Sequence, residues 1–302
     1  MQSYFLGANS KYGFSSLYAG FPPRQQDYLR ILKGGPGTGK STLLKAIANA
    51  AQERGHPVEK ILCSGDPDSL DGIYLPTLSL ALVDGTAPHA LEPGLFGVTG
   101  DYLDLGSRFV LPFSQEEKQA LLALQRDSWE EYRLAYEKLG QAFSLGWNSP
   151  APAQDHDAET VTRSLPKREK PGSIRRVFRS AITCRGILGC ALPQELQLLP
   201  ASPEEILQAS AELSQRGWDL TLCPTPLDPA QPELLLIQEA KLAFLSSAQP
   251  TAASREPMLQ AVEHLSRAKS RHDEMEAIYR PHMDLEALTR EAEAQIAAIF
   301  PQ

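Results

Sequence analysis

The chain has 302 residues, of which 42% are hydrophobic and 22% are charged. These proportions are typical of a globular protein and exclude a disordered or fibrous chain, and the length leaves room for two domains. The formal net charge of −8 disfavours nonspecific attraction to nucleic acid or to an anionic membrane, so we expect neither as a partner. The basic residues from Lys167 to Arg179 leave a local basic patch open, although a solvated linker is the simpler interpretation.

The sequence shows no secretory signal and no membrane span. Met1–Gly7 lacks the basic residues and following apolar run of a signal, and no stretch approaches the roughly 18 uninterrupted apolar residues of a membrane helix. The four cysteines form no C-x-x-C pair and have no histidine at zinc-site spacing. Reduced thiols are the simplest account of them, so we expect a cytoplasmic protein.

The first third of the chain predicts strands alternating with a helix. Leu29–Lys33 is a short apolar segment typical of a strand, and Thr42–Ala48 is a strong helix former. Two more strands are expected near residues 58–63 and 77–83. These make about three strands, fewer than the five or six of an average sheet.

Long helices are predicted on both sides of a weak middle segment. Apolar residues recur at helical spacing from Gln115 to Phe143, which predicts an amphipathic helix or a helical hairpin. Residues 144–172 are rich in Pro, Ser and Ala and predict a linker or a surface excursion. A second helical stretch is expected from Met258 to Phe300, and Pro281 should kink or break it.

Short segments of the first half recur in the second half. The pairs that lie 162 residues apart are Arg54-Gly55 with Arg216-Gly217, Asp66-Pro67 with Asp228-Pro229, and Leu80-Ala81 with Leu242-Ala243. Matches upstream of these need a shift of 173, so the second copy has lost about eleven residues in between. Chance matching is the alternative. We predict a tandem duplication, with a nucleotide-binding domain at 1–145, a linker at 146–172 and a degenerate copy at 173–302, each domain ending in a helical arm.

One motif carries recognisable chemistry. Gly34–Ser41 fits the pattern G-x-x-x-x-G-K-[ST], between the predicted strand and helix. Glycines let successive main-chain N–H groups turn toward phosphate oxygens, and the helix N-terminus adds partial positive charge. Lys40 is predicted to bridge the β- and γ-phosphates, and the Ser41 hydroxyl to ligate Mg²⁺. The predicted phosphate-binding residues are Gly35, Pro36, Gly37, Thr38, Gly39, Lys40, Ser41 and Thr42.

The predicted cofactors are therefore ATP and Mg²⁺. ATP is preferred to GTP because the sequence contains no N-K-x-D motif of the GTPase type. In the second copy, the segment Glu195–Pro203 predicts a strand and then a helix that begins at Ser202, with neither glycine nor lysine. We do not expect that half to bind nucleotide in the same way.

A phosphate loop also needs an acid that holds the water shell of the metal. Asp84 ends an apolar segment and is the first candidate, which makes Lys40 and Asp84 the predicted catalytic residues and Ser41 and Asp84 the predicted metal site. Asp66 is the rival metal-side acid. Asp66-Pro67 recurs in the second copy, which lacks the loop, whereas Asp84 falls on Ser246 and is lost together with the lysine. This comparison favours Asp84 and indicates a turn-forming role for Asp66.

Further candidates stay open. His89 is a γ-phosphate sensor or a loop histidine without a ligand role, and Thr86 is a weaker candidate for phosphate contact. The aromatic stretch from Tyr4 to Tyr18 could supply a ring that stacks on the base, although packing is the commoner fate of such residues. The candidates for an arginine finger, by proximity alone, are Arg24, Arg30 and Arg108.

The chain resembles the P-loop NTPase superfamily and, more narrowly, an uncharacterised bacterial family of tandem-duplicated P-loop ATP-binding proteins. The segments that carry the resemblance are Tyr4–Ser10, Ile31–Thr42, Cys63–Gly72 and Asp84–His89. The resemblance is close over residues 4–90 and loose over 173–300. It implies an α/β fold with a mostly parallel sheet that binds Mg-ATP or Mg-GTP. In that family both halves usually look competent for nucleotide, whereas here the second has decayed.

Three functions compete at this point. In the first, an ATPase couples nucleotide binding and hydrolysis to a conformational change, with the helical arms as output and as candidate surfaces for a protein partner. In the second, a P-loop kinase transfers the γ-phosphate to a small molecule, although only Arg108 follows Asp84 where such kinases carry an arginine-rich lid. In the third, the protein is a nucleotide-dependent switch or scaffold with little turnover.

Overall fold

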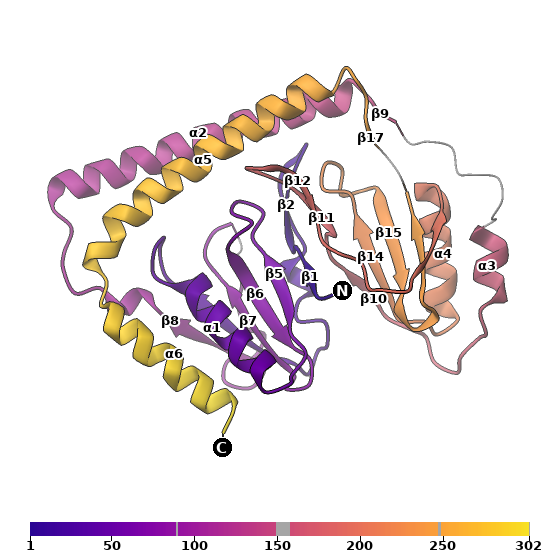
Figure 1. The fold of residues 1–302 in the computed structure, drawn as a ribbon, viewed down its shortest axis with the longest axis horizontal. Coiled ribbons are helices and arrows are strands. Elements are labelled where there is room, and N and C mark those ends of the chain that lie inside the picture. The colour runs from indigo at the N-terminus through magenta and orange to yellow at the C-terminus, as the bar shows by residue number, and fades with distance from the viewer. Residues whose placement is uncertain (89, 149–157, 247–248, 302) are drawn as a thin grey trace. The chain divides into compact units, whose positions relative to one another are not determined.

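The protein has a mixed α/β architecture. The computed structural model describes residues 1–88, 90–148, 158–246 and 249–301 (Figure 1). These residues form two compact units, and neither unit is continuous in sequence. One unit, which we call the loop unit because it contains Gly34–Ser41, comprises Gln2, Phe21–Ala135 and Glu263–Gln302. The other, which we call the companion unit, comprises Met1, Ser3–Gly20 and Tyr136–Val262.

The sheet of the loop unit is mixed rather than mostly parallel, so the sequence-based prediction of strand direction is wrong here. Its strands run in the order β5-β6-β7-β4-β8. Strand β4 lies parallel to β7 and β8, whereas β6 is antiparallel to β5 and β7. Short connections on both sides of β6 permit only antiparallel pairing, because a parallel crossover needs a dozen or more residues. The strands are β4 (Tyr28–Lys33), β5 (Glu59–Leu62), β6 (Leu70–Leu75), β7 (Leu80–Asp84) and β8 (Gly100–Asp104).

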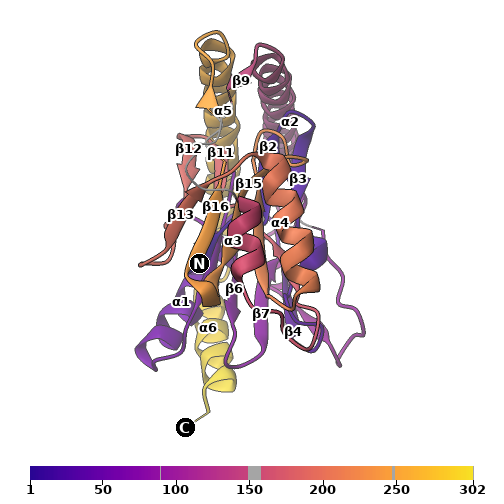
Figure 2. The ribbon, with the colours of Figure 1, turned by 90° about the vertical axis from the view of Figure 1, so that its right-hand side faces the viewer.

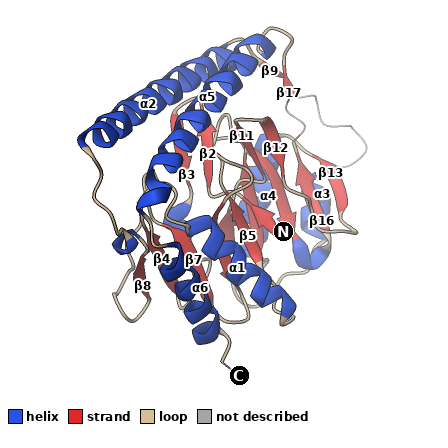
Figure 3. Cartoon of the chain, turned by 60° about the vertical axis from the view of Figure 1, so that its left-hand side comes forward, coloured by secondary structure: helices blue, strands red, loops and turns tan. Residues whose placement is uncertain are grey.

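Helices α1 (Lys40–Glu53) and α6 (Leu285–Ile299) pack together over one face of this sheet (Figure 3). Helix α1 presents an apolar stripe that includes Leu44 and Ile47, both fully buried. Burial of such a side chain contributes about 1.5–3 kcal/mol. The side chains of α6 that complete this core are Leu288, Ala292, Ile296 and Ile299. The C-terminal helix is therefore part of the core beneath the glycine-rich loop.

The two long helices are as the periodicity predicted. Helix α2 (Gln115–Ser144) is one continuous helix. The second stretch consists of α5 (Arg255–Tyr279), the 3-10 turn η4 (Arg280–His282) and α6, so the predicted break at Pro281 is confirmed. Proline lacks the N–H that would continue the ladder. Within the loop unit α2 and α5 run side by side (Figures 1 and 3), and His264 Nδ1 lies 2.6 Å from Glu131 Oε2.

The companion unit has its own mixed sheet, in the order β10-β14-β15-β16-β13. Helices α3 (Ala158–Ser164) and α4 (Pro203–Gln215) lie side by side in this unit (Figure 2). Part of the predicted linker is thus ordered, because α3 packs on α4 and Trp218 Nε1 donates to the Pro166 carbonyl at 3.0 Å. The strands are β10 (Ile174–Arg176), β13 (Gln197–Pro200), β14 (Leu220–Pro224), β15 (Pro232–Ile237) and β16 (Leu242–Leu245).

The two sheets share a strand order. The run β5-β6-β7-β4 of the loop unit recurs as β14-β15-β16-β13 in the companion unit, and each pair of neighbours has the same relative direction. In both units the last strand of the run leads into a helix, α1 or α4. The companion unit also holds two similar hairpins, which are β2 (Gly7–Ser10) with β3 (Gly13–Ser16) and β11 (Ser180–Thr183) with β12 (Gly186–Gly189).

Short elements complete the described chain. They are β1 (Ser3–Tyr4), β9 (Trp147–Asn148), β17 (Gln249–Pro250), η1 (Tyr18–Gly20), η2 (Gly106–Arg108) and η3 (Gln238–Ala240). Among the described helices, none combines the length and the apolar character needed to cross a bilayer.

Candidate phosphate-binding site

The glycine-rich loop joins the end of β4 to the start of α1. Because β4 is parallel to β7 and β8, all three strands end at the same edge of the sheet as the loop begins. In the register, Leu32 lies opposite Asp84 and Lys33 lies opposite Asp104. The outer edge at the carboxyl ends of parallel strands is where α/β sheets bind ligands.

The backbone of the loop depends on its glycines. Gly39 is the N-cap residue of α1 with φ of 81°, and Gly37 has φ of 70°. Both values lie in the left-handed region, which glycine adopts at little cost. Within the described structure no side chain caps this end of α1. The first N–H groups of the helix therefore have no intrahelical or capping partner and are suited to an anion.

The structure brings Lys40 and Asp84 together. Lys40 Nζ donates to the carbonyl oxygens of Gly34 and Gly35, each at 2.8 Å, and lies 3.6 Å from Asp84 Oδ2. The two side chains are only 11% and 15% exposed. Asp84 Oδ1 accepts from the N–H of Thr86 at 2.8 Å and from its hydroxyl at 2.6 Å. The carboxylate is thus oriented beside the lysine, at the edge where the loop begins.

Ser41 and Asp66 have other partners. The Ser41 hydroxyl accepts from the N–H of Leu70 at 2.9 Å, at the start of β6. Asp66 accepts from the Ser69 hydroxyl at 2.9 Å and lies 3.5 Å from Lys269 Nζ. These contacts hold the turn between β5 and β6. Among the described residues no three His, Cys, Asp or Glu side chains are grouped as metal ligands. Mg²⁺ usually takes one or two protein ligands, with phosphates and waters as the others.

Sequence analysis missed the contribution of α5 to the loop. The N–H of Gly37 donates to Glu276 Oε1 at 3.3 Å. A Cβ added at Gly37 would lie 3.3 Å from the Glu276 carbonyl oxygen, and one added at Gly35 would lie 3.2 Å from Tyr279 Cε1. The end of α5 therefore lies directly against the loop. No local signal in the sequence joins residues so far apart.

An aromatic cluster surrounds Tyr279. Its ring centroid lies 5.7 Å from that of Phe109 and 5.2 Å from that of Phe113. His282 lies 4.2 Å from the Phe113 ring, and its Nε2 is 3.0 Å from Glu117 Oε1. These contacts tie the turn between α5 and α6 to the segment before α2. They fix the position of Tyr279 beside Gly35.

The remaining sequence candidates are placed as follows. Tyr4, Phe5 and Tyr18 are fully buried, which agrees with packing as the role of the aromatic stretch. His89 lies outside the described residues. Thr86 contacts Asp84, as given above.

The three arginines have partners of their own. Arg24 donates to the Pro76 carbonyl at 3.4 Å, and Arg30 makes two hydrogen bonds to Asp101. Arg108 lies 2.8 Å from Glu291 on α6. Arg108 ends η2, whose Gly106 is near the loop, because a Cβ added there would lie 3.6 Å from Gly34 Cα.

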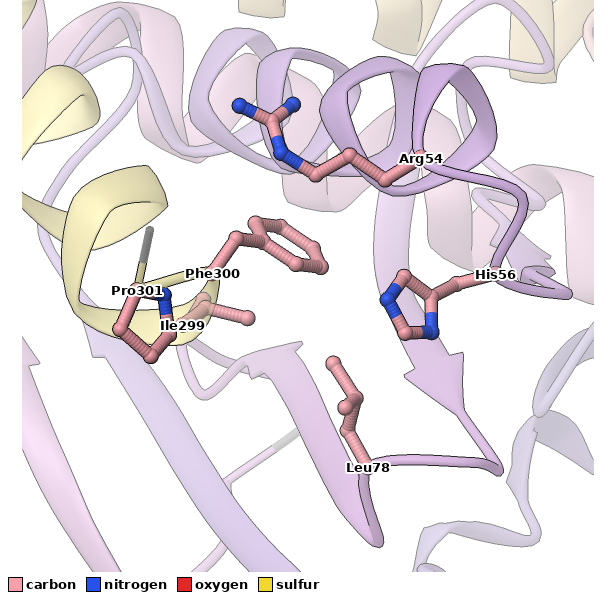
Figure 4. Close-up of a pocket in the computed structure, with 6 residues that line it drawn as sticks. All are labelled: Arg54, His56, Leu78, Ile299, Phe300 and Pro301. Carbon is pink, nitrogen blue, oxygen red and sulfur yellow. The ribbon is translucent and has the colours of Figure 1, made fainter.

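A separate cavity of about 410 Å³ lies at the far end of α1 (Figure 4). Arg54 and His56 line one side of it, and the end of α6 lines the other. The Arg54 guanidinium lies 5.2 Å from the centre of the Phe300 ring. Helix α1 is about 20 Å long at about 1.5 Å per residue, so this cavity is distant from Lys40. The other residues that line it are Leu78, Ile299 and Pro301.

The corresponding place in the companion unit has different chemistry. Helix α4 begins with a capping box, in which Ser202 Oγ accepts from the Glu205 N–H at 3.2 Å and Glu205 Oε2 accepts from the Ser202 N–H at 2.6 Å. Pro203 occupies the first turn. The start of α4 is thus satisfied by its own side chains. The prediction that this half lacks a phosphate loop agrees with this arrangement.

Comparisons with protein-family models, with curated proteins and with solved structures find no match to the chain. The argument for the site therefore depends on the geometry of the loop unit itself.

Proposed function

We propose that the chain binds Mg-ATP through the Gly34–Ser41 loop and hydrolyses it, coupling the nucleotide state to a conformational change. The observation that carries this proposal is the start of α1, where a glycine N-cap at φ 81° directly precedes Lys40. Free N–H groups at a helix start bind phosphate oxygens, and glycines permit their close approach. Lys40 adds the positive charge that a polyphosphate requires.

The residues of the loop have separate roles in this proposal. Lys40 would exchange the carbonyls of Gly34 and Gly35 for β- and γ-phosphate oxygens. Ser41 would hold Mg²⁺, and Asp84 would hold a water of its shell. When bound, Mg²⁺ neutralises charge on the phosphate oxygens. Asp66 is the weaker candidate for this acid, since it already holds the Ser69 hydroxyl and faces Lys269.

We also propose that the two sheets derive from one duplicated P-loop-type unit whose second copy has decayed. The shared strand order supports this, together with the recurring segments 162 residues apart. The bounds of β6 and β15, at Leu70–Leu75 and Pro232–Ile237, differ by the same shift of 162. In the companion unit, the capping box of α4 stands where the loop unit has its glycines.

A nucleotide-dependent switch with little turnover is the second candidate. The contact of Glu276 with Gly37 favours it, because this contact connects a long helix to the loop. In either case we propose α2 and α5 as the output of the nucleotide site and as the surface for a protein partner. A kinase would need an acceptor, which the experiment below would detect.

The test is to follow the γ-phosphate of labelled ATP with magnesium, first with the protein alone and then with a pool of metabolites. Release as phosphate supports the ATPase, transfer to a metabolite supports a kinase, and binding without either supports the switch. Lys40→Ala should abolish binding. The matched control is Lys45→Ala, since Lys45 is an exposed lysine on the same helix. Absence of any binding at millimolar ATP by the folded wild type would overturn the proposal.

A further inference from the structure

The last turns of α5 place an acidic side chain on the phosphate loop. Glu276 Oε1 accepts from the N–H of Gly37 at 3.3 Å. The main chain of α5 is equally close, since the Glu276 carbonyl oxygen would lie 3.3 Å from a Cβ at Gly37. The Gly37 amide is among those expected to face phosphate. A carboxylate oxygen therefore stands where the proposed function requires a phosphate oxygen.

The charge of Glu276 suits this position. Its Oε1 lies 3.3 Å from His272 Nε2, one turn earlier on α5. The hydrogen bond with His272 lowers the pKa of Glu276 most; burial raises it, and the Gly37 N–H and the charge of Lys269 lower it further. The carboxylate is therefore ionised at neutral pH. An ionised acceptor makes a stronger hydrogen bond to a main-chain N–H than a neutral one.

We propose that Glu276 is an internal competitor for the phosphate loop, so that nucleotide binding and the contact of α5 with the loop exclude each other. This inference rests on the proposed function, because a competitor requires an anionic ligand to exclude. A phosphate oxygen and the carboxylate cannot share the Gly37 amide, since like charges repel at this distance. Nucleotide binding thus displaces Glu276 and releases the end of α5 from the loop. The occupancy of the site is in this way transmitted to the long helix.

The competitor lowers the apparent affinity for nucleotide. A ligand that binds only the fraction of molecules with a free loop shows a dissociation constant increased by the inverse of that fraction. With Glu276 on the loop in about nine molecules of ten, its removal tightens binding about tenfold. The same linkage requires that nucleotide loosens the contact of α5 by an equal factor.

The experiment compares Mg-ATP binding by calorimetry to the wild type, Glu276→Ala and Glu276→Gln. The glutamine keeps the size and the acceptor without the charge, and it guards against misfolding of the alanine variant. Glu274→Ala is the matched control, because it removes an equal charge from the same helix and Glu274 pairs with Arg271 at 2.8 Å. Amide hydrogen exchange of residues 270–282, with and without Mg-ATP, follows the release of α5.

We expect Glu276→Ala to bind Mg-ATP about tenfold more tightly than the wild type and Glu276→Gln to lie between them, with Glu274→Ala unchanged. Nucleotide should increase exchange in 270–282 of the wild type. Equal affinities of Glu276→Ala and Glu274→Ala, with the wild type still binding ATP, would overturn the competitor and leave the proposed function intact. Binding by Glu276→Ala alone would support the competitor. Absence of binding in every variant would remove both proposals.

Discussion

Helices α1 and α4 follow equivalent strands in two sheets of the same order, but their first turns are satisfied in opposite ways. In α4, Ser202 and Glu205 cap the helix reciprocally. In α1, the N-cap is Gly39 in the left-handed region, without a side-chain cap among the described residues. A helix that caps itself uses the N–H groups that an external anion would need. The same backbone frame therefore serves stability in one unit and is left suited to a ligand in the other.

The largest expected effect is on nucleotide affinity when Lys40 is compared with Ser202. Lys40→Ala should weaken Mg-ATP binding by about 100-fold, since charge-assisted hydrogen bonds contribute about 1.5–3 kcal/mol. Ser202→Ala should leave the affinity unchanged. Calorimetry at constant salt measures both. Similar losses in the two variants would mean that the companion unit contributes to binding, and the contrast between the units would be wrong.

The next effect concerns the acid beside the lysine. Asp84→Asn should reduce the magnesium-dependent part of ATP binding by about tenfold, because a neutral amide holds the water shell of the metal less well. Its counterpart Ser246 has a buried hydroxyl without a hydrogen-bond partner among the described residues, so Ser246→Ala should have no effect. Titration of ATP with and without magnesium separates the two. A larger loss in Asp66→Asn than in Asp84→Asn would assign the metal-side role to Asp66.

A smaller effect is expected on stability at the capped helix. Ser202→Ala should lower the free energy of unfolding by about 1 kcal/mol, which is typical of the loss of an N-cap. Thr42→Ala, an exposed change in the first turn of α1, should stay within about 0.5 kcal/mol. Urea denaturation at neutral pH measures both values. Equal losses would show that the first turns of α1 and α4 depend equally on side-chain caps.

The smallest effect tests the interior of the companion unit. Burial raises the pKa of Cys190 to about 11 and that of Cys223 to about 12. Both thiols should therefore stay neutral and unreactive toward a thiol reagent at pH 8, whereas the half-exposed Cys184 should react. Their contribution to stability is complete below the unfolded value near 9 and decreases as the pH rises toward 11–12. Rapid reaction of Cys223 at pH 8 in folded protein would contradict the packing of this sheet.

The sequence by itself determined the features that depend on neighbouring residues. The glycine-rich segment, its strand and its helix follow from a contiguous motif, and α2 follows from an apolar repeat within one helix. The break at Pro281 follows from the missing N–H of a single residue. The strand β6 was missed because Asp71-Gly72 is typical of a turn. In the sheet Gly72 permits close approach, since a Cβ there would lie 2.8 Å from the Leu82 carbonyl oxygen.

Only the tertiary structure decided which segments share a unit. Residues 263–301 pack with the loop, so Glu276 and Tyr279 become part of the candidate site although more than 200 residues separate them from Gly37. Periodicity records which face of a helix is buried, but it does not record which partner covers that face. The direction of β6 was likewise set by short connections and pairing rather than by composition. Local chemistry is written in adjacent residues, whereas the assembly of a site depends on contacts that chain folding alone brings together.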